Sequence, residues 1–104
     1  MSTFDDRESA FENKFAHDAE MQFRAEARRN KLLGLWAAGL LGKTGDEATA
    51  YAMDVVKADF EEAGHEDVYR KIFNDIGHLT DEATIRGKLD TLMGEAKAQL
   101  MSEL

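Results

Sequence analysis

The sequence predicts an all-α fold: a four-helix bundle with an extended, flexible or helical amino-terminal segment. It contains no proline and only eight glycines in 104 residues, so few positions prevent a helix or force a turn. Alanine, leucine, glutamate and lysine outnumber isoleucine, valine and threonine, which favours helices over strands. With 43% hydrophobic residues, a chain of this length is expected to form one domain with one core.

The first predicted helix begins near Thr3 and meets no breaker before Gly42, which makes it about 38 residues long. Its two halves differ in composition. Residues 32–41 are apolar around nearly the whole circumference, whereas residues 4–19 carry few apolar side chains. Those few form a narrow aromatic stripe of Phe4, Phe11 and Phe15. The second half therefore belongs in a core, and the first half does not.

Three shorter helices are predicted to follow. Thr44 and Glu47 have the spacing of a capping box, and the helix they open runs to a stop at Gly64. The next runs from about residue 66 to Gly77, and the last begins with Thr80 as its N-cap. The last helix has the most regular apolar spacing, at Ile85, Leu89, Leu92, Met93, Ala96 and Leu100.

Helix lengths divide the chain into two parts. Short connectors make sequential helices antiparallel neighbours, so the three shorter helices are expected to wrap the apolar half of the first. Close approach of backbones is expected at small residues, including Gly34, Gly87 and Gly94. The first helix would span about 57 Å and its longest partner about 33 Å. The sequence therefore predicts a bundle over residues 19–104 and a separate segment over residues 1–18.

The aromatic stripe of that segment has two interpretations. A helix of this length is marginal without tertiary cover, so Phe4, Phe11 and Phe15 could anchor the segment in a groove of another protein. Alternatively, the three rings fold back onto the bundle or form a dimer seam. Their spacing leaves both possibilities open, and a monomer is expected when the protein is free.

Composition excludes several classes of function. A net charge of −8 argues against nucleic-acid binding, because phosphate backbones attract clustered cations. The absence of cysteine removes disulfides and thiolate chemistry. The acidic start has no apolar export signal, and the longest apolar run is shorter than the roughly 20 residues that cross a bilayer. We therefore expect a soluble cytoplasmic protein without direct membrane insertion.

Catalytic and metal-binding groups are not expected. Glu62 with His65, and Asp75 with His78, have the carboxylate–histidine spacing of di-iron bundles. In both pairs a glycine expected to end a helix lies between the partners, so they would not share a helical face. No serine or threonine has an evident histidine base. The sequence predicts neither an enzyme nor a metal site.

A basic cluster near the start of the bundle offers an alternative, ligand-binding function. Arg24, Arg28, Arg29 and Lys31 form the cluster. Arg24 and Arg28 are four residues apart, so they flank one stripe and can pair with carboxylates or with nucleotide phosphates. Further along, Gly42 and Lys43 resemble the end of a phosphate-binding loop, although the first glycine is missing and a helix precedes them.

We interpret that turn as a helix-ending glycine followed by a cap, although Lys43 and the free amides beside it still suit an anion. The alternative function is thus a nucleotide-binding or ligand-sensing bundle with weak ATP or ADP binding. Its candidate residues are Arg24, Arg28, Arg29 and Lys43. No dedicated cofactor is expected.

Several sequence segments resemble the zeta subunits that inhibit ATP hydrolysis by the F-type ATP synthase of alpha-proteobacteria. The strongest are Phe15-Ala16-His17-Asp18-Ala19-Glu20 and the run from Phe23 to Ala38. Residues 3–8, 68–71 and 85–86 are also similar, so the resemblance covers nearly the whole chain.

This resemblance implies a four-helix bundle whose amino-terminal segment inserts at the catalytic interface between alpha and beta subunits, against the rotating gamma subunit. The protein would then be cytoplasmic and peripheral to the inner membrane through ATP synthase. The family has also been credited with nucleotide binding, which the resemblance assigns to no residues. The inhibitory residues that it implies are Phe4, Asp5, Asp6, Arg7, Glu8, Phe11, Lys14 and Phe15.

Overall fold

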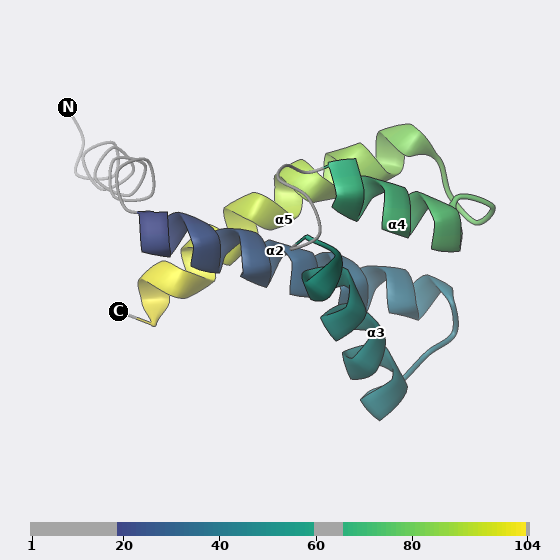
Figure 1. Cartoon of the computed structure of the whole chain (residues 1–104), viewed down its shortest axis with the longest axis horizontal. Coiled ribbons are helices and arrows are strands. Elements are labelled where there is room, and N and C mark those ends of the chain that lie inside the picture. Colours follow the sequence, from purple (N-terminus) through teal and green to yellow (C-terminus); the bar gives the residue numbers. More distant parts are fainter. Residues whose placement is uncertain (1–18, 60–65, 104) are drawn as a thin grey trace.

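The computed structural model describes residues 19–59 and 66–103, which form four helices and no strand (Figure 1). This confirms the all-α prediction. Residues 1–18 lie outside the described ranges, so the predicted long first helix is seen only from residue 19 onward. In the part described, no helix is both long and apolar enough to span a bilayer. The helices are α2 (Ala19–Leu40), α3 (Gly45–Ala58), α4 (Glu66–Ile76) and α5 (Glu82–Ser102).

Helix α2 ends in a glycine cap, as its sequence predicts. Gly42 has φ +77°, a left-handed conformation that glycine adopts without a Cβ penalty. The N–H of Lys43 donates to the carbonyl of Ala38 at 2.9 Å, and the N–H of Gly42 donates to that of Gly39 at 3.2 Å. These two bonds form a Schellman motif, which satisfies carbonyls that the helix end leaves open.

One predicted capping interaction and two predicted boundaries need correction. Thr44 is the N-cap of α3, as predicted, but its side chain makes no capping hydrogen bond, so the predicted capping box is wrong. Helix α3 ends at Ala58, earlier than predicted, and Gly64 lies outside the described residues. The N-cap of α5 is Asp81, whose carboxylate accepts the Thr84 N–H at 2.7 Å. Aspartate is a stronger N-cap than threonine, which explains the shift from Thr80.

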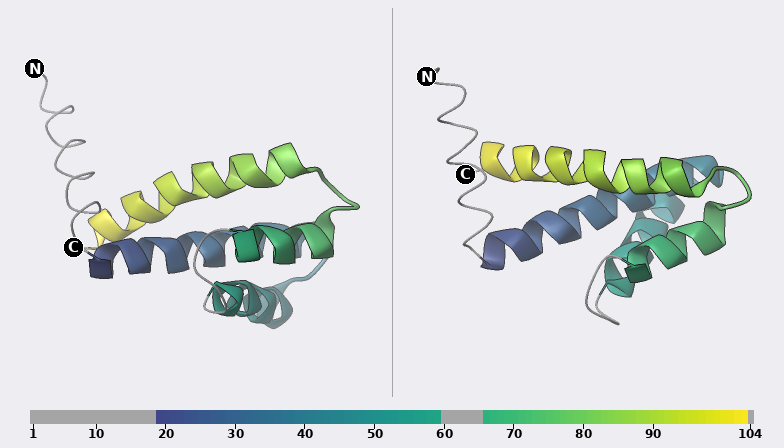
Figure 2. Two further views of the ribbon diagram at one scale, coloured as in Figure 1. Left: turned by 45° about the horizontal axis from the view of Figure 1, so that its top comes forward. Right: turned by 90° about the horizontal axis from the view of Figure 1, so that it is seen from above.

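The two long helices form an antiparallel pair, and the two short helices lie at one end of it. Figures 1 and 2 show α5 running back alongside α2. Helix α3 lies across the carboxyl-terminal half of α2, and α4 contacts α2, α3 and α5 at the same end. The expectation that all three partners pack on the apolar half of the first helix is confirmed by the main core, and α5 also extends beyond that half. Its last turns reach Met21 and Ala25 near the start of α2.

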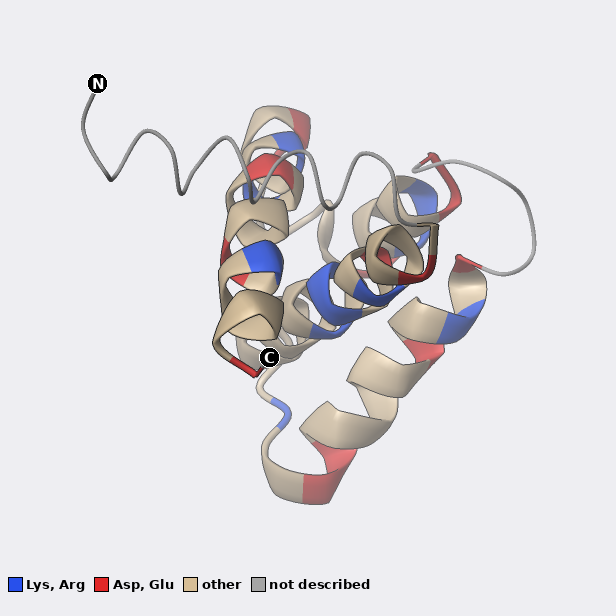
Figure 3. Cartoon of the chain, turned by 90° about the vertical axis from the view of Figure 1, so that its left-hand side faces the viewer, with Lys and Arg blue, Asp and Glu red and all other residues tan. Residues whose placement is uncertain are grey.

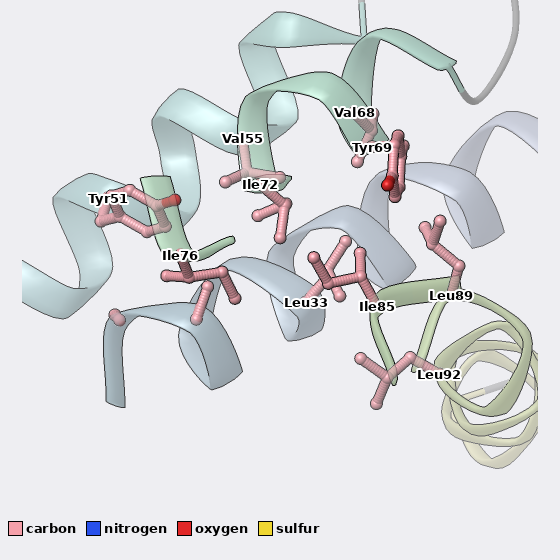
Figure 4. Packing of buried hydrophobic residues seen from close by; sticks show 12 residues of the cluster. Leu33, Tyr51, Val55, Val68, Tyr69, Ile72, Ile76, Ile85, Leu89 and Leu92 are labelled. Atoms are coloured by element: carbon pink, nitrogen blue, oxygen red, sulfur yellow. The ribbon is translucent and has the colours of Figure 1, made fainter. Parts of the chain in front are cut away.

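The main core joins all four helices (Figure 4). Leu33, Val55, Ile72 and Ile85, one from each helix, are completely buried. Full burial of each such side chain contributes about 1.5–3 kcal/mol. Around them the cluster is completed by Ala37, Ala38, Tyr51, Val68, Tyr69, Ile76, Leu89 and Leu92.

Gly34 sets the distance between α2 and α3. A Cβ added at Gly34 would lie 2.6 Å from the Cα of Ala52, so only glycine permits this approach. At Gly87 and Gly94 an added Cβ would meet nothing within 4 Å. The prediction of close backbone contact is therefore confirmed at Gly34 and wrong at the two glycines of α5.

A second, smaller cluster joins the start of α2 to the end of α5. Met21, Ala25 and Leu100 are its buried members, with Met93 and Met101 packed against them. Between the two clusters, α2 buries the polar pair Arg29 and Asn30. The core therefore consists of two apolar parts separated along α2 by polar side chains.

Candidate functional site

The predicted inhibitory residues Phe4, Asp5, Asp6, Arg7, Glu8, Phe11, Lys14 and Phe15 lie outside the described residues. The structure does place the point at which their segment joins the bundle. Helix α2 begins at Ala19, at the end of the bundle where α5 terminates (Figure 1). The chain therefore enters the described bundle at its α2/α5 end.

Arg24 and Arg28 on the first half of α2 pair with carboxylates, as predicted. The Arg24 Nη2 lies 2.6 Å from Glu20 Oε1. Arg28 donates to both carboxylate oxygens of Glu103, at 2.8 and 3.0 Å, and to Gln99 Oε1 at 2.9 Å. The two-pronged bond lowers the pKa of Glu103 and raises that of Arg28. It also fixes the end of α5 against α2.

Arg29 points to the interior instead of joining this charged surface. Its side chain is only 2% exposed, and its guanidinium donates to Asn30 Oδ1 at 3.0 and 2.9 Å. Burial lowers the pKa of Arg29. The burial follows a spacing visible in the sequence, because Arg29 lies four residues after Ala25 and four before Leu33, both completely buried.

Lys43 lies beyond the opposite end of α2. Fifteen positions separate it from Arg28 in the sequence, which corresponds to about 20 Å along a helix axis. The structure thus places Arg24 and Arg28 together, buries Arg29, and leaves Lys43 at the far end. The four residues proposed for phosphate binding are not gathered at one site, and nucleotide binding by them stays a prediction.

A groove with a volume of about 370 Å³ lies between α2, α3 and the end of α5. Figure 3 looks onto the end of the bundle where α2 begins and shows Lys and Arg positions along α2. Sequence reasoning missed this groove because three helices contribute to it. Its lining residues are Phe23, Arg24, Ala27, Arg28, Lys31, Met53, Val56, Leu100 and Glu103.

The carboxylate–histidine pairs do not form a metal centre in the part of the chain that the structure describes. Within residues 19–59 and 66–103, no three His, Cys, Asp or Glu side chains gather in a metal-binding arrangement. Asp75 instead accepts hydrogen bonds from Tyr51 Oη at 2.7 Å and Lys71 Nζ at 3.1 Å, which connects α3 to α4. Glu62 and His65 lie outside the described residues.

These observations define the class of the protein as a small all-α bundle with a charged, grooved surface at the end where residues 1–18 join it. Comparison with known proteins then identifies the family. Residues 1–99 match the family model described as ATPase inhibitor subunit zeta, and the chain belongs to this family.

A solved structure supports the fold independently. A solution NMR structure with 67% sequence identity matches 81% of this chain and 99% of its own, with a TM-score of 0.75. No curated protein sequence matches the chain. Membership of the zeta family agrees with the resemblance found in the sequence. It supports inhibition of ATP synthase, association with that enzyme and a regulatory role.

Proposed function

We propose that the protein inhibits ATP hydrolysis by inserting residues 1–18 at the catalytic interface of F-type ATP synthase, between alpha and beta subunits and against gamma. One observation carries this proposal: the zeta family match begins at residue 1 and includes the whole segment. The buried clusters described above connect α2, α3, α4 and α5 to one another. The bundle thus supplies a folded body, and the segment supplies the blocking element.

The chemistry of residues 1–18 suits insertion between subunits. Phe4, Phe11 and Phe15 provide apolar area, and Asp5, Asp6, Arg7, Glu8 and Lys14 provide charges of both signs. Aromatic side chains in desolvated pockets carry much of the binding energy at protein interfaces. If the segment orders on binding, its affinity is reduced by the entropy of ordering. Acting there, the protein is cytoplasmic, peripheral to the inner membrane and not itself an enzyme.

Deletion of residues 1–18 tests the proposal. The shortened protein is expected to keep its helical circular dichroism and its unfolding midpoint, because the buried clusters lie in α2–α5. It is expected to lose inhibition of ATP hydrolysis by purified ATP synthase. A full-length Leu79→Ala protein, changed at a side chain that is 48% exposed, serves as the control and should inhibit fully. Undiminished inhibition by the shortened protein would refute insertion.

Nucleotide binding is a second proposal, favoured by the placement of Arg24 and Arg28 on the groove. Guanidinium groups suit phosphates, although both already contact carboxylates. Titration of ADP into the isotopically labelled protein should shift the amide resonances of residues 23–31. An Arg24→Gln protein should respond more weakly. Shifts absent from both the groove and the Lys43 turn would exclude this function.

A further inference from the structure

We infer that the groove between α2, α3 and α5 is a second contact with ATP synthase. The groove binds an acidic segment of the enzyme that bears an apolar side chain and lies next to the site where residues 1–18 insert. This inference rests on the proposed function and adds to it. Residues 1–18 block hydrolysis, whereas the groove holds the bundle on the enzyme surface.

The floor of the groove exposes large apolar side chains. Phe23 on α2 is 53% exposed and Met53 on α3 is 43% exposed, and the groove also takes in Val56 and Leu100. Methionine adapts its shape to a partner, and aromatic side chains are enriched at interfaces. A groove between helices with such a floor suits the apolar face of a helix or an extended segment.

The charge of the groove is opposite to that of the chain as a whole. Arg24, Arg28 and Lys31 line it, and Glu103 is the only carboxylate among the described residues of the lining, in a protein with a net charge of −8. Glu103 is bonded to Arg28, while Lys31 is exposed. Arg24 pairs with Glu20, but both side chains are more than half exposed, and such pairs are weak enough to exchange. The complementary partner is therefore acidic.

The position of the groove favours the enzyme as its occupant. Residues 23–31 follow closely after residues 1–18, so a protein that binds the segment lies beside the groove. From Ala19 to Lys31 the distance along α2 is about 18 Å. A second copy of this chain fits poorly, because a symmetric dimer would bring two cationic grooves face to face.

The test uses full-length proteins and titrates their inhibition of ATP hydrolysis by purified ATP synthase. Lys31→Glu reverses a charge of the groove, and Met53→Ala removes part of its floor. Each is expected to raise the half-inhibitory concentration about 10-fold without changing maximal inhibition, because losing a close charge or apolar contact commonly weakens binding by this factor. The Lys31→Glu effect should shrink as salt is raised.

Matched controls lie at the other end of the bundle. Lys88→Glu makes the same charge change on α5, where Lys88 lies over the Trp36 ring. Leu40→Ala removes a side chain that is 42% exposed, close to the exposure of Met53. Both controls should inhibit as the wild type does. Wild-type half-inhibitory concentrations for both groove variants would overturn the inference while leaving insertion intact, whereas a wild-type protein without inhibition would overturn the proposed function itself.

A photo-reactive amino acid in place of Met53 identifies the occupant. Cross-linking to a segment of ATP synthase rich in aspartate and glutamate would support the inference. Cross-linking only to residues 1–18 of the same chain, or only to a second copy, would overturn it. So would tighter inhibition by Lys31→Glu, because that result would mean that the groove normally retains the inhibitory segment.

Discussion

The two halves of α2 differ in what they pack against and in what they expose. The carboxyl-terminal half packs against three helices through fully buried Leu33, Ala37 and Ala38. The amino-terminal half packs mainly on α5 through a small cluster of Met21, Ala25 and Leu100, and its outer face carries the arginines and the groove. One helix therefore supports the main core at one end and, at the other, carries the groove that we propose as a binding surface.

The polar pair Arg29 and Asn30 lies on α2 between the main core and the smaller cluster. Arg29 is 2% exposed and Asn30 is completely buried. Among residues 19–59 and 66–103, the Asn30 Nδ2 finds no hydrogen-bond partner. The apolar core is interrupted at this level, so the two clusters should contribute unequally to stability.

The largest effect is expected from truncating a leucine in each cluster. Leu33→Ala removes a completely buried side chain from the main core and should lower the free energy of unfolding by about 3–5 kcal/mol. Leu100→Ala, at 6% exposure beside the groove, should cost about 2 kcal/mol, since less of its surroundings is close-packed. Urea unfolding measures both. Equal losses would contradict the proposed difference between the two ends.

A smaller effect is expected from two glycine substitutions that should change the free energy of unfolding in opposite directions. Gly34→Ala places a Cβ against the α3 backbone and should destabilise the main core by about 1–3 kcal/mol. Gly94→Ala meets open space on α5 and should stabilise the helix by about 0.5–1 kcal/mol. Thermal unfolding of both proteins distinguishes them. A stabilising Gly34→Ala would show that α2 and α3 are not in close contact.

Alkaline pH should weaken the α3–α4 side of the body. Burial, and then the hydrogen bond to Asp75, raise the pKa of Tyr51 above its ordinary value of 10.0. The folded state therefore holds the phenolic proton more tightly than the unfolded state. This contribution to stability is complete below about pH 10 and is lost as the pH rises further.

Unfolding midpoints measured from pH 7 to pH 11 test this expectation. The wild type should lose stability above pH 10, and Tyr51→Phe should lose less over the same interval. Burial also raises the pKa of Tyr69. The unfolding midpoint of Tyr51→Phe should therefore still fall with rising pH, but less steeply than that of the wild type. Identical slopes for the two proteins would show that Tyr51 ionises normally in the folded state.

The fold was largely predictable from local patterns. Three features each act within one helix and can be read directly from the sequence. They are the absence of proline, the Gly42 stop and the regular spacing of Ile85, Leu89 and Leu100. Burial confirmed that spacing except at Met93, which is only partly buried. Boundaries were less predictable, because Thr80 and Asp81 are adjacent capping candidates and their geometry decides between them.

The site was less predictable, because it depends on contacts between helices. The arginines looked like one cluster, and only the α2 stripe of Ala25, Leu33 and Ala37 indicated that Arg29 would be buried. The groove is lined by α2, by Met53 of α3 and by Glu103 after α5. The spacing of residues within a single helix cannot predict which residues of other helices lie beside it. The aromatic stripe left partner binding and packing on the bundle both open for residues 1–18, and the inhibitory role proposed for them came from the family resemblance.

The division between a folded body and an inhibitory segment is tested most directly by replacing Phe4, Phe11 and Phe15 together with alanine in the full-length protein. The measurement is ATP hydrolysis by ATP synthase as a function of inhibitor concentration, with the urea midpoint of the free protein alongside. Inhibition should weaken by at least about 10-fold, because aromatic anchors dominate such interfaces, and the urea midpoint should not change. Wild-type inhibition, or a large loss of stability in the free protein, would contradict the division.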